Sequence, residues 1–288
     1  MQYRPSGFNV LPPVVKNLLI INGLFFLATI VLGQRSIDLT DYLALHHWYS
    51  GKFKIWQIIT HMFMHGNVGN PMYANYEQGF MHIFSNMFAL WMFGSVIENT
   101  LGSKRFLTFY LLCGIGAAFL HLGVLTYQFN IAHDYLTEFV NNPTYKQFSL
   151  YLTQNDYSPQ SQLGSQLFEL KSRWAESPQN PSFANEATIG LQSIYNAQIN
   201  EGSVGASGAV FGLLFAFGFL FPNTLIYIYF LIPLKAKYFV ALYALFELYA
   251  GVQNSAGDNI AHFAHLGGML VAFIILKIWN KKNRTHFY

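Results

Sequence analysis

Long stretches of this chain contain few or no charged residues, and they limit what the chain can fold into. They lie at about residues 17–34, 78–97, 106–128, 207–222, 238–253 and 259–279. A helix that crosses a bilayer needs about 20 mostly apolar residues. Only 10% of the residues are charged, whereas soluble domains carry about 25%. The chain is therefore predicted to be an all-α polytopic membrane protein, a bundle of six transmembrane helices.

The positive charges predict the orientation of these helices. If the N-terminus is cytoplasmic, six crossings return the C-terminus to the same side. The short cytoplasmic segments would then hold ten of the sixteen Lys and Arg residues, namely Arg4, Lys16, Lys104, Arg105, Lys235, Lys237, Lys277, Lys281, Lys282 and Arg284. Such segments are enriched in Lys and Arg, so both termini are expected in the cytoplasm. The expected location is a bacterial inner (plasma) membrane.

Two segments between the predicted helices are unusual. Residues 130–202 are polar and rich in Asn, Gln and Ser, which predicts a long extracytoplasmic insertion between helices 3 and 4. This insertion, with an amphipathic helix near Gln162–Trp174, interrupts an otherwise single membrane domain over residues 1–288. The apolar segment Leu225–Leu234 contains Pro233 and is too short to span. It could be re-entrant or lie along the membrane interface.

Ser207 lies in the motif Gly-Ala-Ser-Gly (205–208) at the head of an uncharged run. Gly205 and Gly208 permit close approach of the backbone and unusual dihedral angles. A serine that starts a helix also has free backbone N–H groups beside it, which can stabilise an oxyanion. The alternative is that these small residues only pack one membrane helix against another.

His265 lies in Ala-His-Leu-Gly-Gly (264–268) within the last uncharged run. Small residues recur at helical spacings of three or four positions in both runs, at Ala261, Ala264, Gly268, Ala272, Gly208 and Gly212. Such faces let two membrane helices approach closely. This packing could bring the Ser207 hydroxyl within about 2.6–3.2 Å of the imidazole, the contact that a nucleophile and its base require. The alternative is a buried histidine bonded to a carbonyl group.

No acidic residue is placed in the sequence to orient His265. Asp258 is better suited to capping the last helix, and Glu247 belongs to a different predicted helix. The simplest interpretation is a Ser–His dyad without a carboxylate.

Further histidines precede these motifs. His82 and Asn86 are spaced to share one helix face, and both can donate hydrogen bonds to an oxyanion; the alternative is polar contact between helices. His61 and His65 have the same spacing. Four histidines and Glu247 could in principle bind zinc, but the His-x-x-x-His motif lacks the glutamate of a zincin. No metal site is predicted, and the single cysteine excludes a Cys-based one.

In their order along six helices, these motifs resemble the rhomboid family of intramembrane serine proteases. The resemblance rests on Gly205–Gly208, Ala264–Gly268, His82 with Asn86, His61 with His65, and Glu98-x-x-x-Gly102. It implies that Ser207 is the nucleophile and that His265 is the general base and then the general acid. It also implies that His82, Asn86 and the Ser207 backbone N–H are the oxyanion donors.

The same resemblance assigns supporting roles. Glu98 resembles a structural residue near the cytoplasmic end of the second helix, and His262 is expected to support packing or hydration. Phe211 stands where a tyrosine is frequent and can still pack on the imidazole. The chain departs from the family in an insertion at Gly66–Phe80, in Gln57 where an arginine is often found, and in the long segment before Ser207. These departures affect access to the site rather than its chemistry.

The implied function is that of an intramembrane serine endopeptidase that cleaves transmembrane helices near the outer part of the bilayer. Its expected partners are single-span membrane proteins and the lipid bilayer, with no nucleic acid and no metal or organic cofactor. The substrate would enter between helices 2 and 5, where Glu247 could lie at the gate. One alternative is a catalytically silent rhomboid-like protein that binds and escorts transmembrane helices. A transporter or channel is the other, but the absence of internal repeats disfavours a transporter.

Overall fold

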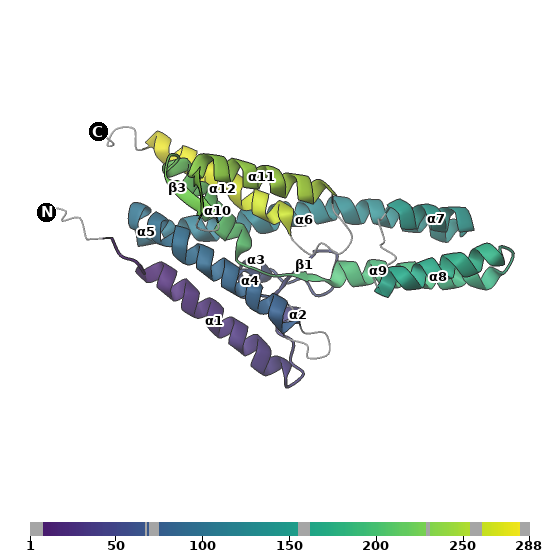
Figure 1. The fold of residues 1–288 in the computed structure, drawn as a ribbon. Helices are drawn as coiled ribbons and strands as arrows, with labels where there is room; N and C mark the ends of the chain where they lie inside the picture. Colours follow the sequence, from purple (N-terminus) through teal and green to yellow (C-terminus); the bar gives the residue numbers. More distant parts are fainter. Residues whose placement is uncertain are drawn as a thin grey trace.

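The computed structural model describes residues 8–66, 68, 75–154, 162–228, 231–253 and 261–282. The chain is mainly helical and has two parts (Figure 1). One part is a bundle that contains both ends of the described chain. The other is a set of helices that extends away from one end of the bundle.

Four helices of the described residues are long and apolar enough to cross a membrane. They are α1 (Pro13–Gly33), the continuous helix Tyr76–Leu101, α6 (Ser103–Asn141), and residues His262–Asn280 of α12 (His262–Lys282). The second of these consists of α4 (Tyr76–Ala89), a π-helical turn η2 (Leu90–Gly94) and α5 (Ser95–Leu101). The sequence predicted two more spans. The structure has a helix at each of these places, α10 (Ser207–Leu220) and α11 (Ala236–Gln253). Neither is among the four, and α10 is shorter than each of them.

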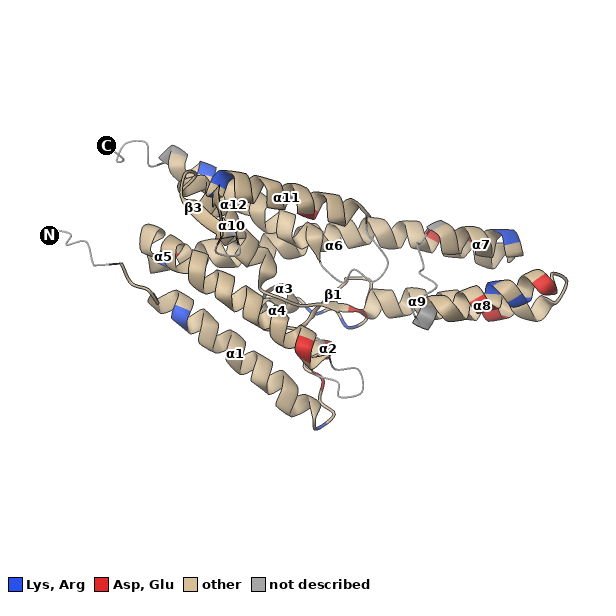
Figure 2. Cartoon of the chain, in the orientation of Figure 1, with Lys and Arg blue, Asp and Glu red and all other residues tan. Residues whose placement is uncertain are grey.

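Large apolar side chains cover the outside of this bundle. They include Leu24 and Leu27 on α1, Phe84 on α4, and Leu245 and Tyr249 on α11, each more than half exposed. Few charged residues interrupt the helices of the bundle, whereas α8 carries both signs of charge (Figure 2). So much exposed apolar surface suits contact with lipid rather than water, and the chain is a multi-pass membrane protein.

Helix α10 lies at the centre of the bundle. It packs mainly against α12 and α6 and is buried on almost every side. With 14 residues it is about 21 Å long, less than the roughly 30 Å of a bilayer core. A Cβ atom added to Gly268 of α12 would overlap the carbonyl oxygen of Gly208 in α10. The predicted close approach of these two helices through their small residues is therefore confirmed.

The described residues between 130 and 202 are mostly helical. The sequence predicted that the third helix ends at about Gln128, but α6 continues to Asn141 because polar residues can end a membrane span without ending a helix. It is followed by α7 (Tyr145–Gln154), α8 (Gln162–Glu176) and α9 (Pro181–Asn200). The predicted amphipathic helix is confirmed as α8.

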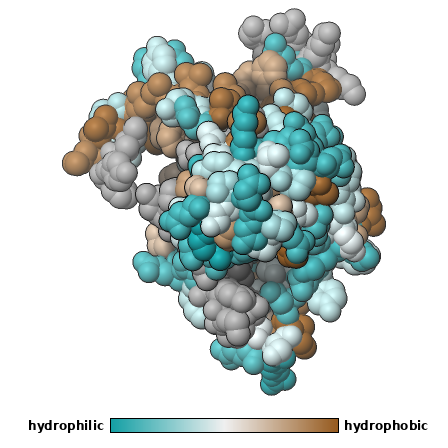
Figure 3. Space-filling view, turned by 90° about the vertical axis from the view of Figure 1, so that its right-hand side faces the viewer, coloured by the Kyte–Doolittle hydropathy of each residue, from teal (hydrophilic) through white to brown (hydrophobic). Residues whose placement is uncertain are grey.

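These helices enclose an apolar core of their own. It includes Phe139, Phe148, Trp174 and Leu191, all buried. Figure 3 views the molecule from this end, and most of the surface that faces the viewer is hydrophilic. Residues 130–202 therefore form a packed helical extension rather than an open loop.

The apolar segment after α10 forms a β-hairpin, and its re-entrant or interfacial placement stays a prediction. Strand β3 (Leu225–Ile228) pairs with β4 (Ile232–Lys235) in antiparallel register, with Leu225 opposite Lys235. β-Branched and aromatic residues at 226–228 and 232 favour a strand. A second short pair joins β1 (Leu45–His46) to β2 (Gly202–Ser203), so the chain entering α10 is attached to the first loop.

The first loop contains α2 (Thr40–Leu43), α3 (Gln57–Thr60) and a 3₁₀ turn, η1 (His61–Phe63). The fully buried Gln57 holds this loop together. Its Oε1 accepts from the backbone N–H of Lys54 at 3.0 Å, and its Nε2 donates to the carbonyl of Lys52 at 3.0 Å. Its own carbonyl accepts from Nδ1 of His61 at 2.8 Å. Gln57 therefore supplies loop contacts at the position where the resemblance leads one to expect an arginine.

Glu98 joins the start of α1 to the start of α6. Its two carboxylate oxygens accept from the backbone N–H groups of Val14 and Val15 at 3.0 and 2.8 Å. The Ser103 hydroxyl donates to the same carboxylate at 2.6 Å. The first N–H groups of a helix have no partner within the helix, and a negative charge there is favourable. These contacts fit the structural role expected for Glu98.

Candidate active site

Ser207 is the first residue of α10, and the turn before it is held by backbone contacts. The N–H of Gly205 donates to the carbonyl of His61 at 2.9 Å, and Gly205 has φ +131°. A Cβ atom there would lie 2.9 Å from Nε2 of His82 and 3.6 Å from Oγ of Ser207. Only glycine combines this backbone conformation with this close approach. His82 and the Ser207 hydroxyl consequently flank Gly205.

His265 packs against the same face of α10. Its ring stacks on Phe211, with ring centroids 3.9 Å apart and planes only 4° apart. Phe211 follows Ser207 by four residues, so the two side chains share one face of the helix. The predicted packing of Phe211 on the imidazole is confirmed.

No hydrogen bond joins Ser207 to His265, although the structure describes both residues. Catalytic hydrogen bonds are often long or poorly aligned without a substrate and shorten only in the complex. The predicted contact between the hydroxyl and the imidazole therefore stays a prediction.

Glu247 lies against two histidines of α12, and its expected place at a substrate gate stays a prediction. Its carboxylate is 2% exposed and faces the bundle interior. Oε2 lies 2.8 Å from Nδ1 of His265 and 2.7 Å from Nδ1 of His262. The dyad without a carboxylate therefore needs correction, because α11 brings an acidic group to His265. Asp258, the other acid considered, lies outside the described residues.

His82 and Asn86, the proposed oxyanion donors, share one face of α4. The amide of Asn86 donates to the carbonyl of His82 at 3.0 Å, and Asn86 is buried. An amide nitrogen carries two N–H groups, so this bond leaves one for another acceptor. His82 lies beside Gly205 and Ser207, and Asn86 lies one helical turn further along α4.

His61 and His65 lie behind His82. Burial lowers the pKa of His61 to about 4, and burial together with the neighbouring His82 lowers the pKa of His65 to about 3. Both rings are consequently neutral at pH 7. The ring of His65 meets that of His82 nearly edge-on, with centroids 5.2 Å apart. These two histidines are suited to supporting His82 rather than to carrying charge. In the insertion predicted at residues 66–80, positions 67 and 69–74 lie outside the described residues, and residues 76–80 form the start of α4.

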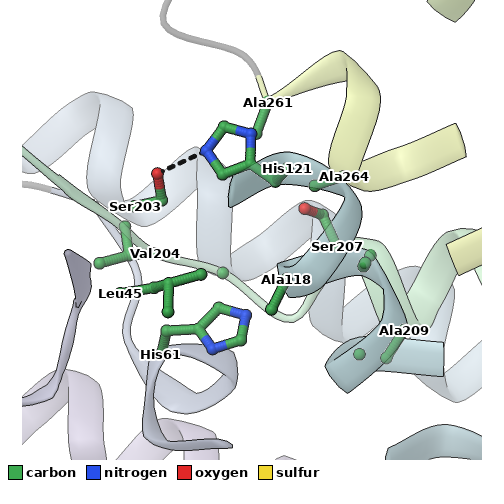
Figure 4. Close-up of a pocket in the computed structure, with 14 residues that line it drawn as sticks. Leu45, His61, Ala118, His121, Ser203, Val204, Ser207, Ala209, Ala261 and Ala264 are labelled. Carbon is green, nitrogen blue, oxygen red and sulfur yellow. Dashed lines mark hydrogen bonds between the residues drawn. The ribbon is translucent and has the colours of Figure 1, made fainter. Parts of the chain in front are cut away.

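A small pocket opens beside Ser207 (Figure 4). Its polar lining comes from His61, His121, Ser203 and Ser207, and Nε2 of His121 lies 2.8 Å from the Ser203 hydroxyl. Its cavity volume is about 20 Å³, which is enough for at least one water molecule. His121 and Ser203 were not among the residues predicted for the site. A histidine in an uncharged run is a signal of function in a membrane protein, and it applied to His121 as it did to His265.

Comparison with known proteins places these motifs in a family. The Rhomboid domain matches residues 52–131 and 185–281. The chain belongs to the rhomboid family. It is also 24% identical over 281 residues to an uncharacterized mitochondrial rhomboid protein of Schizosaccharomyces pombe. The alignment covers 92% of this rhomboid chain but only 64% of that relative.

The two segments that match the rhomboid domain contain every residue of the site. His61, His65 and His82 lie in the first segment, and Ser207, Glu247 and His265 in the second. The residues between the segments include α7 and α8. The site therefore stands on the rhomboid part of the chain, and the helical extension lies largely outside it.

The site also contains a group of side chains that could bind a metal. One ligand atom each from Glu247, His262 and His265 lies within 4.8 Å of the others. The zinc site considered from the sequence also used Glu247, together with four histidines. Two hydrogen bonds already account for the position of the Glu247 carboxylate.

Proposed function

We propose that this rhomboid is a serine endopeptidase that cleaves transmembrane helices within the bilayer. The observation that carries the proposal is the position of His265. Its ring stacks on Phe211, one turn from Ser207, and its Nδ1 lies against a buried carboxylate. A nucleophile, a base and a group that orients the base are the parts that acyl transfer by serine requires.

Each residue has a role in the proposed reaction. Ser207 Oγ attacks the carbonyl carbon of the scissile peptide bond as its proton moves to Nε2 of His265. His82, Asn86 and the Ser207 backbone N–H donate to the oxyanion that forms. His265 then donates the proton to the departing amine. A water molecule, activated by the same imidazole, hydrolyses the acyl-enzyme and regenerates Ser207. No metal or organic cofactor takes part.

The proposed substrates are membrane proteins with one transmembrane helix. A helix hides its carbonyl groups in its own hydrogen bonds, so the substrate must unwind locally before Ser207 can attack. Three polar side chains, His61, His121 and Ser203, line the pocket beside Ser207, which supports it as a reservoir of the hydrolytic water.

The six-span topology, with both termini cytoplasmic and Ser207 and His265 toward the outer leaflet, belongs to the same proposal. The Lys and Arg distribution supports it, and so do the helices α10 and α11 at the two predicted positions. The helical extension is then the extracytoplasmic insertion between spans 3 and 4. Its largely hydrophilic surface in Figure 3 supports this assignment. The bacterial plasma membrane stays a prediction, and the name of the S. pombe relative places that protein in mitochondria.

Replacement of Ser207 by alanine tests the proposed function. Wild-type protein in liposomes is expected to cleave a reporter protein with one transmembrane helix, and Ser207→Ala is expected to give no product above the uncatalysed rate. The reason is that alanine has no oxygen to attack the peptide carbonyl. Gel mobility and mass spectrometry of the fragments measure cleavage and locate the bond.

Ala216→Ser provides a control, because it adds one oxygen atom in the same helix, nine residues away from Ser207 and outside the lining of the pocket. It should cleave as the wild type does. If a panel of such reporters bound to the wild type and none was cleaved, the chain would be a silent rhomboid-like protein that escorts helices. Equal cleavage by wild type and Ser207→Ala would remove Ser207 from the role of nucleophile.

A further inference from the structure

Glu247 is a buried carboxylate in a helix whose other side chains are largely apolar. The outward residues of α11 include Leu242, Leu245 and Tyr249, whereas Glu247 is 2% exposed. An acidic side chain at this depth is costly unless it is paired. Its partners among the described residues are two imidazoles of α12, each within 2.8 Å of the same oxygen. The Glu247 carboxylate of α11 is therefore paired with these two imidazole rings.

These two contacts fix where the ring protons are. An ionised carboxylate only accepts hydrogen bonds, so Nδ1 of His265 and Nδ1 of His262 must both donate. A neutral imidazole with its proton on Nδ1 has its lone pair on Nε2. That is the tautomer that His265 needs in order to take a proton from Ser207. In the other tautomer, the lone pair of His265 would face the carboxylate, which repels it.

The contacts also fix the orientation of the ring. Phe211 holds the ring plane by stacking, and Glu247 holds one edge of the ring by its hydrogen bond. Since the two nitrogens lie on different edges of the ring, bonding Nδ1 to Glu247 directs Nε2 away from α11. His262 donates to the same oxygen from one turn earlier on α12, which keeps the carboxylate in place.

We propose that Glu247 is a positioning residue for His265, so that the site is a Ser207–His265–Glu247 triad whose carboxylate is held by His262. This inference rests on the proposed function. It replaces the gate role expected for Glu247 with a role at the base. It also predicts that the effect of Glu247 falls on the chemical step rather than on substrate binding.

Glu247→Gln tests the triad with almost no change in side-chain volume. The glutamine amide can donate to Nδ1 of His265 and thereby favour the wrong tautomer. We expect kcat for reporter cleavage to fall on the order of 10³-fold or more, by analogy with the loss of the orienting aspartate in a Ser–His–Asp site, with KM unchanged. Glu247→Asp keeps the carboxylate and is expected to recover part of this loss.

The matched control is Glu98→Gln, which removes the charge of another buried carboxylate far from Ser207 in the sequence and bound to backbone N–H groups. It is expected to lower the Tm and to leave kcat of the folded protein unchanged. Equal kcat for the wild type and Glu247→Gln would overturn the triad and leave the proposed function intact. A parallel loss in kcat for both Gln variants would also overturn it, because the effect would then be one of general stability.

A spectroscopic measurement tests the same inference without activity. The ¹⁵N shifts of the His265 ring in wild-type protein, assigned with His265→Asn, report which nitrogen carries the proton. Protonation on Nδ1 in wild type, lost in Glu247→Gln, supports the triad. Protonation on Nε2 alone in wild type would overturn it. The ¹⁵N measurement tests the triad even if the wild type shows no cleavage that depends on Ser207. In that case only the proposed function fails.

Discussion

Replacement of His265 by alanine is expected to reduce reporter cleavage by about 10⁴-fold or more, as loss of the base does in other Ser–His enzymes. Without the imidazole, the Ser207 hydroxyl keeps its proton and stays a weak nucleophile. The ring also fills the space over Phe211 and donates to Glu247. Initial rates in liposomes measure the loss, and thermal unfolding in detergent shows how much of the protein remains folded.

His47→Phe is the matched control for this variant. His47 is also buried, donates from Nε2 to the Thr126 hydroxyl at 2.9 Å, and packs against the ring of Phe129. It lies outside the site, so its replacement by another ring should leave cleavage at the wild-type rate. Wild-type cleavage by folded His265→Ala would show that another group acts as the base.

Replacement of Gly268 by valine is expected to prevent the bundle from packing. Even a Cβ atom at this position would overlap the carbonyl oxygen of Gly208, and backbone cannot move aside as a flexible side chain can. Overpacking typically costs about 1–3 kcal/mol, occasionally more, and here it would also push His265 away from Ser207. A misplacement of about 1 Å can cost on the order of 10²-fold in rate. Gly268→Val should therefore lower both the Tm and the cleavage rate of the folded fraction.

Gly123→Ala is the control for this prediction. Gly123 lies in α6 of the same bundle, and a Cβ atom there would meet nothing within 4 Å. Alanine is favoured over glycine in a helix by about 1 kcal/mol, so the Tm should be unchanged or slightly higher. A Tm for Gly268→Val equal to that of the wild type would mean that α10 and α12 do not meet at this glycine.

The sequence predicted the positions of Ser207 and His265 better than the contacts around them. The small residues of the Ser207 and His265 runs predicted that α10 and α12 approach closely, because close helix packing needs short side chains at regular spacing. Glu247 could not be placed in the same way. Its position depends on the rotation of α11, and neither spacing nor hydropathy determines how a helix is rotated about its axis.

The differences in the fold have a similar origin. Hydropathy locates the end of a membrane span, whereas the end of a helix depends on backbone hydrogen bonds and capping. The continuation of α6 to Asn141 was therefore missed. The segment Leu225–Leu234 was short and apolar, and such runs do not distinguish a strand from a buried helix. The register of β3 with β4 depends on pairing that only the folded chain supplies.

Labelling of Ser207 by a fluorophosphonate probe tests the central claim most directly, because it needs no knowledge of the natural substrate. The probe phosphonylates a serine only when a neighbouring base activates it. Peptide mass spectrometry of wild-type protein should find the adduct on Ser207, and His265→Ala should show almost none. An adduct on a different residue, or equal labelling of Ser207 in wild type and His265→Ala, would contradict the assignment of these two residues as nucleophile and base.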